Sequence, residues 1–391
     1  MKKKYNYIKR IRNCIIASML SAGLILTSLT PSEVFAGIKA TTPMKPWRYV
    51  KKTANYEVNS TSKKYKDIWT SATNKWCDKG FKWTKKDSSK TKLSSYYDDS
   101  KQGLQVAGKC ETSYRISDGH INKNKVWLNR AALDKYNYTT AEKVCVAEHE
   151  LGHALGLAHN NKGSVSVMNP ANRGDNIKDC DVKGMNKRYS TKISNDVIDP
   201  NAEVTVTEYF YVVKPKLKKI KVKYDKEADK IVISGKVKRA KKVVSKYNGV
   251  KKTVKVNAKN KFTIEYKYSA AKKITLYGVN NKNEKITKKK SIESEKYVTK
   301  TPICRKIIHD KKGITYELDT VAGAILTVKN KGKVISKEVV DSSFSKFFIS
   351  SESLKRMSGK ISFTQEVTGK KVSKEASYKI IDKGSVYAQT Y

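Results

Sequence analysis

Three histidines and a glutamate stand at spacings that suit one metal ion. His149 and His153 are four residues apart, so on a helix both side chains project from one face and can bind the same ion. Glu150 lies between them, where its carboxylate can take a proton from a water molecule on the metal. Gly156 permits a turn after the helix, and the turn can bring His159 back as a third nitrogen ligand. Three protein ligands leave a fourth tetrahedral position open, which is the pattern of catalytic zinc sites.

The alternative interpretation is a buried helix whose histidines are satisfied by backbone carbonyls. The whole chain has five histidines, and three of them lie inside this motif, which favours the metal site. Of the other two, His120 follows Ser117, Asp118 and Gly119, and we expect an ordinary turn histidine there.

A methionine downstream of the histidines supports the same interpretation. Met168 lies in the run Ser166-Val167-Met168-Asn169-Pro170, which is short and turn-like. A metal site built on a helix and a loop needs an apolar floor, and a methionine in a tight turn provides a flexible one.

Together these residues resemble the metzincin metalloproteases, and within them the matrixins, over about residues 45–190. The likeness rests on the eleven-residue histidine motif, on Met168 and Pro170, and on the stretch Asp181–Tyr189, which is similar to the family's closing helix. The resemblance implies an α+β domain with a mixed twisted sheet and a zinc-ligand helix. It implies one catalytic zinc, Glu150 as the base and a protein or peptide as the substrate.

The sequence also departs from the family. Asn160 replaces the usual serine after the third histidine, and Pro170 stands where some relatives carry a tyrosine. Outside the motif this region has only His120, so a second, structural zinc is not expected. Whether the protein also binds calcium is left open, because the sequence does not identify ligands for it. Matrixins often keep the zinc blocked with a propeptide cysteine, and nothing between the expected leader and Cys77 could do so here.

Export allows disulfides, and five cysteines follow the leader. Cys77 and Cys110 flank the first expected strands, whereas Cys180 begins the closing helix, which packs near Cys145 in matrixin-like folds. The pairs Cys77–Cys110 and Cys145–Cys180 are therefore expected, with Cys304 free. The alternative is that all five are reduced core cysteines.

The first 36 residues read as a secretory signal peptide. A charged start with six lysines and arginines precedes an apolar stretch over 14–29, and Val34-Phe35-Ala36 fits a small-residue cleavage site. The apolar stretch is too short and interrupted for a membrane anchor. We therefore expect a secreted, extracellular protein without a transmembrane anchor, possible association with a cell wall being left open.

Periodicity predicts the elements that position the motif. Apolar residues at helical spacing predict an amphipathic helix over 65–78, packed on a sheet by its tryptophans. Strands are expected at 80–85, 92–98 and 124–129. The ligand helix is expected to begin near Thr139, which stands three residues before Glu142 as in a capping box.

The pattern changes after residue 190. Residues 191–212 read as a linker, because Asn, Asp and Pro break the periodicity. Short alternating runs then predict two all-β sandwich modules over 213–296 and 297–391, which loosely resemble bacterial immunoglobulin-like modules.

The charge of the C-terminal half bears on binding partners. The chain carries a formal net charge of +46, and residues 201–391 hold 46 Lys/Arg against 18 Asp/Glu. Such a surface favours polyanions, for which an exported protein meets cell-wall polymers, acidic polysaccharides, membranes or released DNA. A general lysine bias explains the charge equally well. Two alternatives to a protease remain: a non-catalytic cationic protein that binds cell walls or other polyanions, and an antimicrobial or nucleic-acid-binding protein.

Overall fold

The structure is a computed structural model, and it describes residues 41–388 except 61, 161–164, 171–173 and 175. The predicted signal peptide lies outside the described residues. The chain divides into two compact units. The first holds the residues up to Tyr96 with Gly108–Leu128 and Ala141–Tyr211, and the second holds Tyr97–Ala107, Asn129–Thr140 and Val212–Tyr391.

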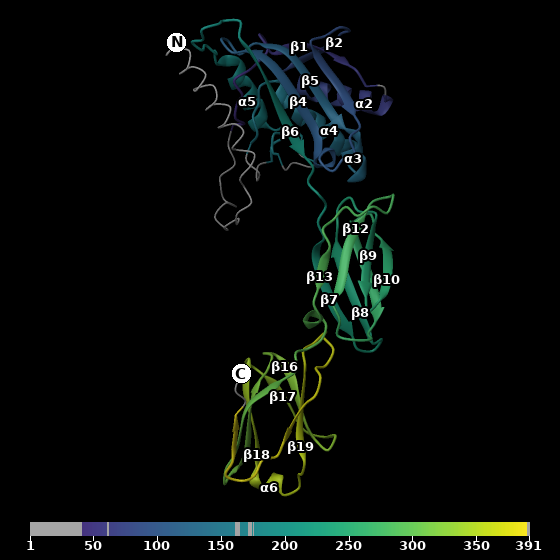
Figure 1. Ribbon diagram of the computed structural model, residues 1–391, viewed down its shortest axis with the longest axis vertical. Helices are drawn as coiled ribbons and strands as arrows, with labels where there is room; N and C mark the ends of the chain where they lie inside the picture. Colours follow the sequence, from purple (N-terminus) through teal and green to yellow (C-terminus); the bar gives the residue numbers. More distant parts are fainter. Residues whose placement is uncertain (1–40, 61, 161–164, 171–173, 175, 389–391) are drawn as a thin grey trace, which may run out of the picture. The chain divides into compact units, whose positions relative to one another are not determined.

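The first unit is built on a six-stranded mixed sheet in the order β2-β1-β3-β5-β4-β6 (Figure 1). Strand β1 pairs in parallel with β2 and β3, whereas β4 and β5 form an antiparallel hairpin. The strands are β1 (Thr53–Val58), β2 (Lys82–Lys85), β3 (Thr91–Tyr96), β4 (Val106–Arg115), β5 (Ile121–Asn129) and β6 (Glu203–Tyr211).

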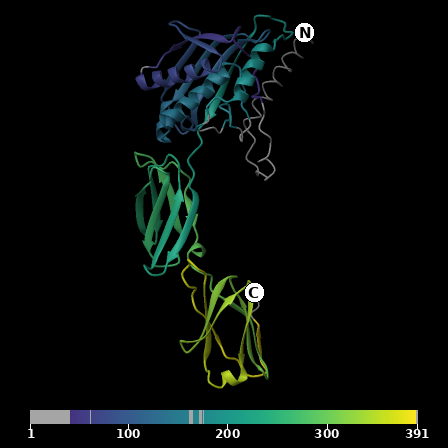
Figure 2. The same cartoon turned by 180° about the vertical axis from the view of Figure 1, so that it is seen from behind.

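Three helices complete this unit: α2 (Lys63–Cys77), α4 (Thr140–Ala154) and α5 (Asp179–Ser190). The purple and blue helices of this part lie over one face of the sheet (Figure 2). Helix α2 buries Ile68, Trp69 and Trp76, as its apolar spacing predicts. Helix α4 is buried on every side from Lys143 to Ala154, so its histidines lie in the interior of the unit.

The second unit contains two short helical segments from the N-terminal half, the 3-10 helix η2 (Gly103–Gln105) and α3 (Arg130–Lys135). Its first β module has a sheet β10-β9-β12-β13 and a sheet β11-β8-β7. The ring of Tyr247 in β9 lies 5.3 Å from that of Tyr266 in β11, so the two sheets pack face to face. The strands are β7 (Lys218–Asp225), β8 (Lys230–Lys236), β9 (Lys242–Tyr247), β10 (Val250–Lys255), β11 (Lys261–Lys267), β12 (Ile274–Val279) and β13 (Lys290–Ile292), followed by the 3-10 helix η3 (Ser294–Lys296).

The second β module is also a sandwich, with sheets β18-β15-β14-β21 and β17-β16-β19-β20. One apolar core joins them, and it includes Tyr316 from the first sheet and Phe363 from the second, with ring centroids 5.1 Å apart. The elements are β14 (Ile303–His309), β15 (Gly313–Asp319), β16 (Ala324–Asn330), β17 (Lys333–Val340), β18 (Phe344–Ser350), α6 (Ser351–Leu354), β19 (Lys360–Glu366), β20 (Ala376–Lys379) and β21 (Val386–Ala388).

The α+β domain followed by all-β sandwiches is therefore confirmed. Helix α4 begins one residue after the expected start. Two strands differ from the expectation: β4 was not predicted, and residues 203–211 form β6 rather than an irregular linker. The alternation of Val204, Val206, Glu208 and Phe210 carried the strand signal, but the turn-forming residues before it concealed this pattern.

Both predicted disulfides are wrong. All five described cysteines are free. Cys110 is fully buried and its thiol lies 3.6 Å from the Thr112 hydroxyl, whereas the Cys77 thiol accepts from the backbone N–H of Trp83. The sulfurs of Cys77 and Cys110 thus have separate local contacts, and proximity in a family fold was not enough to predict a bond. The alternative of reduced cysteines is the one that holds.

Within the part of the chain that the structure describes, no helix combines the length and the apolar character needed to cross a bilayer.

Candidate metal centre

Helix α4 fixes His149 and His153 on one face, one turn apart. The Nδ1 atom of His149 lies 2.7 Å from the carbonyl oxygen of Val167, and that of His153 lies 2.9 Å from the carbonyl oxygen of Leu157. A carbonyl only accepts, so each ring carries its proton on Nδ1. The Nε2 atom of each ring then carries the lone pair, and this is the form of imidazole that binds a metal ion.

The chain leaves the helix at Gly156, where φ is +94°. A side chain there would collide with the carbonyl oxygen of Trp47, so both the backbone angle and the space require glycine. The turn is held by hydrogen bonds from Gly156 N–H to His153 and from Leu157 N–H to Gly152. It returns the chain so that His159 faces the helix, as the sequence predicts.

The three ring nitrogens converge on one point. The Nε2 atom of His159 lies 3.2 Å from Nε2 of His153 and 3.2 Å from Nε2 of His149. Possible ligand atoms of these three residues all lie within 4.8 Å of one another. Three imidazole nitrogens so placed, two of them on rings with a fixed tautomer, fit zinc and leave one tetrahedral position for another ligand.

Burial favours the neutral form of His153 and His159. Burial lowers the pKa of His153 well below its usual value, and the neighbouring His159 and His149 rings lower it further. Burial also lowers the pKa of His159. A neutral imidazole is the form that binds a metal, so the surroundings favour binding over protonation.

Glu150 is fully buried beside this cluster, and neither of its carboxylate oxygens has a hydrogen-bond partner among the described residues. Burial, and after it the charge of Glu208, raise the pKa of Glu150 well above its usual value. Strand β4 approaches closely at Gly108, where an added Cβ would lie 2.7 Å from Glu150 Oε1. An unpartnered buried carboxylate is costly, and such groups are concentrated at functional sites.

The predicted methionine turn lies beneath the histidines. Met168 is fully buried, and its carbonyl accepts from Asn160 N–H at 3.0 Å. Helix α4 presents Gly152 to it, and a Cβ there would collide with the Met168 sulfur. The sulfur therefore reaches the backbone of the ligand helix, which makes Gly152 a second glycine that this site requires.

Asp181 at the start of α5 holds the methionine turn in place. Its buried carboxylate accepts from the Val167 N–H at 3.0 Å, from the Ser166 hydroxyl, and from the Thr42 hydroxyl at 2.6 Å. Since Val167 also supplies the carbonyl that orients His149, Asp181 positions a metal ligand through one intermediate residue. The sequence placed Asp181 in the closing helix but gave it no such role.

Strand β6 reaches the same site, which the sequence did not predict. The Phe210 ring is fully buried, with its centroid 4.5 Å from that of the His149 ring. Glu208, two residues earlier, pairs with the Lys45 ammonium. His120, in contrast, lies at the β4–β5 turn with its Nδ1 2.8 Å from Asp118, as expected for a turn histidine.

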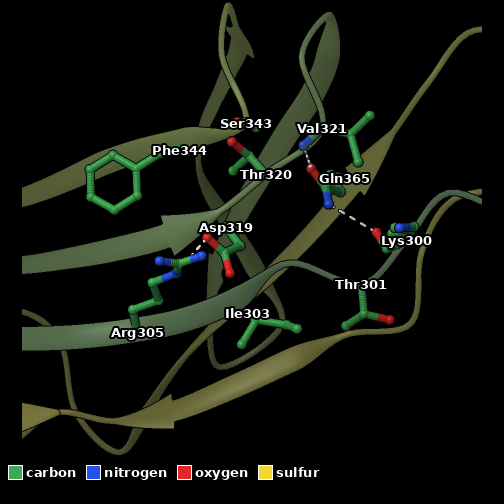
Figure 3. Close-up of a pocket in the computed structure, with 10 residues that line it drawn as sticks. All are labelled: Lys300, Thr301, Ile303, Arg305, Asp319, Thr320, Val321, Ser343, Phe344 and Gln365. Atoms are coloured by element: carbon green, nitrogen blue, oxygen red, sulfur yellow. Dashed lines mark hydrogen bonds and ion pairs between the residues drawn. The ribbon is translucent and has the colours of Figure 1, made fainter. Parts of the chain in front are cut away.

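A separate hollow of about 560 Å³ lies in the second β module (Figure 3). Three of its polar side chains have partners that also line the hollow. Arg305 binds Asp319 at 2.7 Å, and the Gln365 amide joins Lys300 O to Val321 N–H, both at 2.9 Å. Arg305, Asp319 and Gln365 thus hold the segments around the hollow together.

Comparison with known protein families gives a match over the stretch that holds the histidine cluster. The family model of the matrixins, a group of metallopeptidases, matches residues 40–190. No curated protein matches the chain.

Three solved structures show only low similarity to the chain, and they do not bear on its function. The BSP domain of a biofilm associated protein is 16% identical with a TM-score of 0.17, covering 42% of this chain and 29% of that one. The GM1-bound ECX AB5 holotoxin is 16% identical with a TM-score of 0.22, covering 36% and 67%. The human OSCAR ligand-binding domain is 7% identical with a TM-score of 0.27, covering 43% and 100%. The chain thus spans less than a third of the first of these structures.

The motif, the methionine turn, the mixed sheet and the family match coincide over one stretch of sequence. Residues 40–190 are therefore similar to the matrixin family of metallopeptidases, and the histidine cluster lies within this stretch.

Proposed function

We propose that this protein is a secreted zinc-dependent endopeptidase. His149, His153 and His159 bind the zinc, Glu150 is the general base, and Met168 supports the ligands from below. The basic C-terminal modules, predicted over 213–296 and 297–391, attach the enzyme to anionic surfaces.

One observation carries the proposal: the three Nε2 atoms gather next to a buried carboxylate that has no other hydrogen-bond partner among the described residues. A purely structural metal site would be closed by four protein ligands and would not need a free carboxylate beside it. The family match supports the same reaction class.

Zinc, when bound, supplies Lewis acidity that polarises the scissile carbonyl and lowers the pKa of water towards about 7. Glu150 takes the proton of the attacking water and then delivers it to the leaving amine. Its raised pKa favours the acid form that the second step needs. Gly108 keeps the space beside this carboxylate open, since any side chain there would press on it.

The test uses the purified full chain after removal of its leader. We expect about one zinc per chain by metal analysis, with cleavage of a denatured protein that a chelator abolishes and added zinc restores. A chain that holds zinc but cleaves neither proteins nor any member of a peptide library would contradict the proposal, provided that the variant Phe210→Ala is inactive as well. The library also reports the cleavage preference.

A second candidate function follows from the charge. Residues 201–391 carry a net charge of +28, and runs such as Lys288–Lys290 are exposed. A non-catalytic protein that binds polyanions would have this surface as well. Such a protein has no need of Glu150, so the chelator test separates the two functions.

A further inference from the structure

We propose that residues Glu203–Tyr211, strand β6, occupy the peptide-binding edge of the metal site in the manner of a substrate, and that proteolysis requires this strand to leave. The inference rests on the proposed proteolytic function. It assigns to this segment the role of an internal inhibitor.

The first observation is the position of β6 at the end of the sheet. Without it, β4 would be the edge strand, with unpaired N–H and C=O groups next to the ligand helix. The Ile116 N–H donates to the Ala202 carbonyl at 2.9 Å, and the Ser113 and Thr205 hydroxyls lie 2.8 Å apart. The residue numbers rise along β4 while those of the partners in β6 fall, so the two strands are antiparallel. Proteins commonly bind extended peptides by adding them as a strand to such an edge.

The second observation is the direction of the side chains. Alternate residues of a strand point to opposite faces, so Glu208 and Phe210 share one face and Tyr209 lies on the other. Phe210 is fully buried with its ring 4.5 Å from the His149 ring, whereas Tyr209 is 40% exposed. The inward face of β6 therefore covers a metal ligand, where the side chain of a bound peptide would lie.

The third observation is an ion pair that fastens the strand. Glu208 and Lys45 pair with only 17% and 20% of their side chains exposed. The Lys45 N–H donates to the Gly156 carbonyl at 2.8 Å, and its carbonyl accepts from Arg188 at 2.9 Å. Lys45 is thus anchored to the turn that places His159. Through Glu208 it holds β6 against the metal site and away from solvent.

The fourth observation is the tether. Helix α5 ends at Ser190 and β6 begins at Glu203, so 12 residues join the occupant to the domain that it blocks. A short tether keeps a segment at an effective concentration on the order of millimolar. A modest intrinsic affinity is then enough to keep the edge occupied, and a free peptide must compete against that concentration. The inhibitor acts on its own chain, because its tether and its binding edge belong to one unit.

A reversible lock tests the inference on the full zinc-loaded chain. Ser113→Cys with Thr205→Cys places two thiols where the neighbouring hydroxyls now lie, and mild oxidation should join them. We expect mass spectrometry to show this bond, which by itself reports that β6 lies on β4 in solution. The oxidised protein should cleave a short peptide at least about tenfold more slowly than the same protein reduced with a phosphine, a factor equivalent to ~1.4 kcal/mol.

Zinc release gives a readout that is independent of proteolysis. A chelator dye should remove zinc more slowly from the oxidised than from the reduced double variant, because Phe210 then stays over His149. The single variants Ser113→Cys and Thr205→Cys should show no effect of oxidation on either rate.

Matched substitutions on the two faces of β6 provide the second arm. Phe210→Ala removes the buried ring and should raise kcat/KM for a short peptide by about tenfold, as expected for loss of a buried aromatic anchor. Tyr209→Ala, on the exposed face of the same strand, should leave the rate within about twofold of the parent protein, as substitutions away from buried contacts usually do.

The outcomes separate the two proposals. If no variant cleaves any peptide but the lock still slows zinc release, β6 covers the metal site and the proteolytic function is wrong. If the disulfide does not form, or if oxidation changes neither rate and Phe210→Ala does not raise cleavage, the inhibitory role of β6 is overturned.

Discussion

Glu150 is the side chain at which stability and function are most clearly opposed. Burying a carboxylate without a hydrogen-bond partner is costly, and this one is fully buried with both oxygens unpartnered among the described residues. The surrounding strand leaves room for it only because position 108 is a glycine. A group kept at such a cost, beside three converging imidazoles, is best explained by proton transfer.

Replacing the base should stop the reaction without emptying the site. In Glu150→Ala we expect kcat for peptide cleavage to fall by about 10²- to 10⁴-fold, since that is what a positioned general base contributes. Metal analysis should still find zinc in this variant. His159→Ala is the matched comparison, and it should lose zinc affinity together with the rate. Near-normal cleavage by Glu150→Ala would exclude this carboxylate as the base.

The rate of peptide cleavage should be nearly as sensitive to substitution of Gly108 in strand β4. The added methyl group of Gly108→Ala would lie 2.7 Å from Glu150 Oε1 and 3.1 Å from a Val146 methyl carbon, so the carboxylate must shift. Displacing a catalytic group by about 1 Å can cost roughly 100-fold in rate, and we expect a loss of this size with zinc retained. Gly174→Ala, where an added Cβ meets no described atom within 4 Å, is the control. Equal rates for both variants would show that the close approach of β4 has no functional role.

At the scale of elements, the site depends on short irregular segments joined to one rigid helix. Helix α4 supplies two ligands, the turn at Gly156 supplies the third, and the methionine turn orients the first through Val167. Aromatic N–H groups then fix the helix, because Trp47 donates to the His153 carbonyl and Trp76 to the Glu148 carbonyl, both at 2.9 Å. These contacts tie the ligand helix to the segments that carry the two tryptophans.

The β4–β5 turn should contribute a stability that depends on pH. The Arg115 guanidinium first, and the His120 N–H after it, lower the pKa of Asp118 to about 2. A lowered carboxylate pKa stabilises the folded state above the unfolded pKa of about 3.9, and this contribution is lost as the pH falls towards 2. Because the pair is partly exposed, we expect only about 1 kcal/mol.

The measurement compares melting temperatures of the parent chain and Asp118→Asn, both in chelator so that metal loss does not intervene. At pH 7 the variant should melt about 2–4 °C lower, and the difference should shrink between about pH 4 and pH 2. Asp67→Asn removes an exposed carboxylate that pairs with Lys63 on α2, and it should change little. A difference that persists unchanged at pH 2 would exclude this ion pair as the cause.

At the scale of the whole molecule, most of the charge and the candidate metal centre are separated along the sequence. The histidine cluster lies in the first unit, and no second cluster of metal-ligating side chains is found among the remaining described residues. The second unit carries most of the lysines on two sandwiches whose cores are closed by their own aromatic residues. Exposed lysines of this number act through their summed field, which salt screens within about 8–10 Å at physiological strength.

Binding to a polyanion should therefore follow the salt concentration. We expect the full chain to be retained on an acidic polysaccharide column at low salt and to elute as ionic strength rises. Reversing the exposed run Lys288–Lys290 to glutamate should lower the salt needed for elution, while cleavage of a short peptide stays unchanged. Retention that does not respond to salt, or its absence at low salt, would leave the two modules as spacers.

The sequence by itself predicted the histidine cluster of this protein and the class of its fold. Metal-ligand spacing on a helix, a glycine at the turn and a methionine downstream are local patterns, and local geometry turns them directly into the metal site. Periodicity of 3.6 and of 2 predicted helix α2, the ligand helix and the β-rich second half for the same reason.

Only the tertiary structure decided which distant segments meet at the site. Gly108, Asp181 and Lys45 contact the centre from separate elements, and no local pattern records such contacts. Neither expected disulfide is present, and the sulfurs of Cys77 and Cys110 have separate local contacts that spacing does not describe. Strand β6 is the clearest case: nine residues in a stretch that reads as a linker become the last strand of the sheet. An edge strand binds whichever extended segment can reach it, and that is decided by the path of the folded chain.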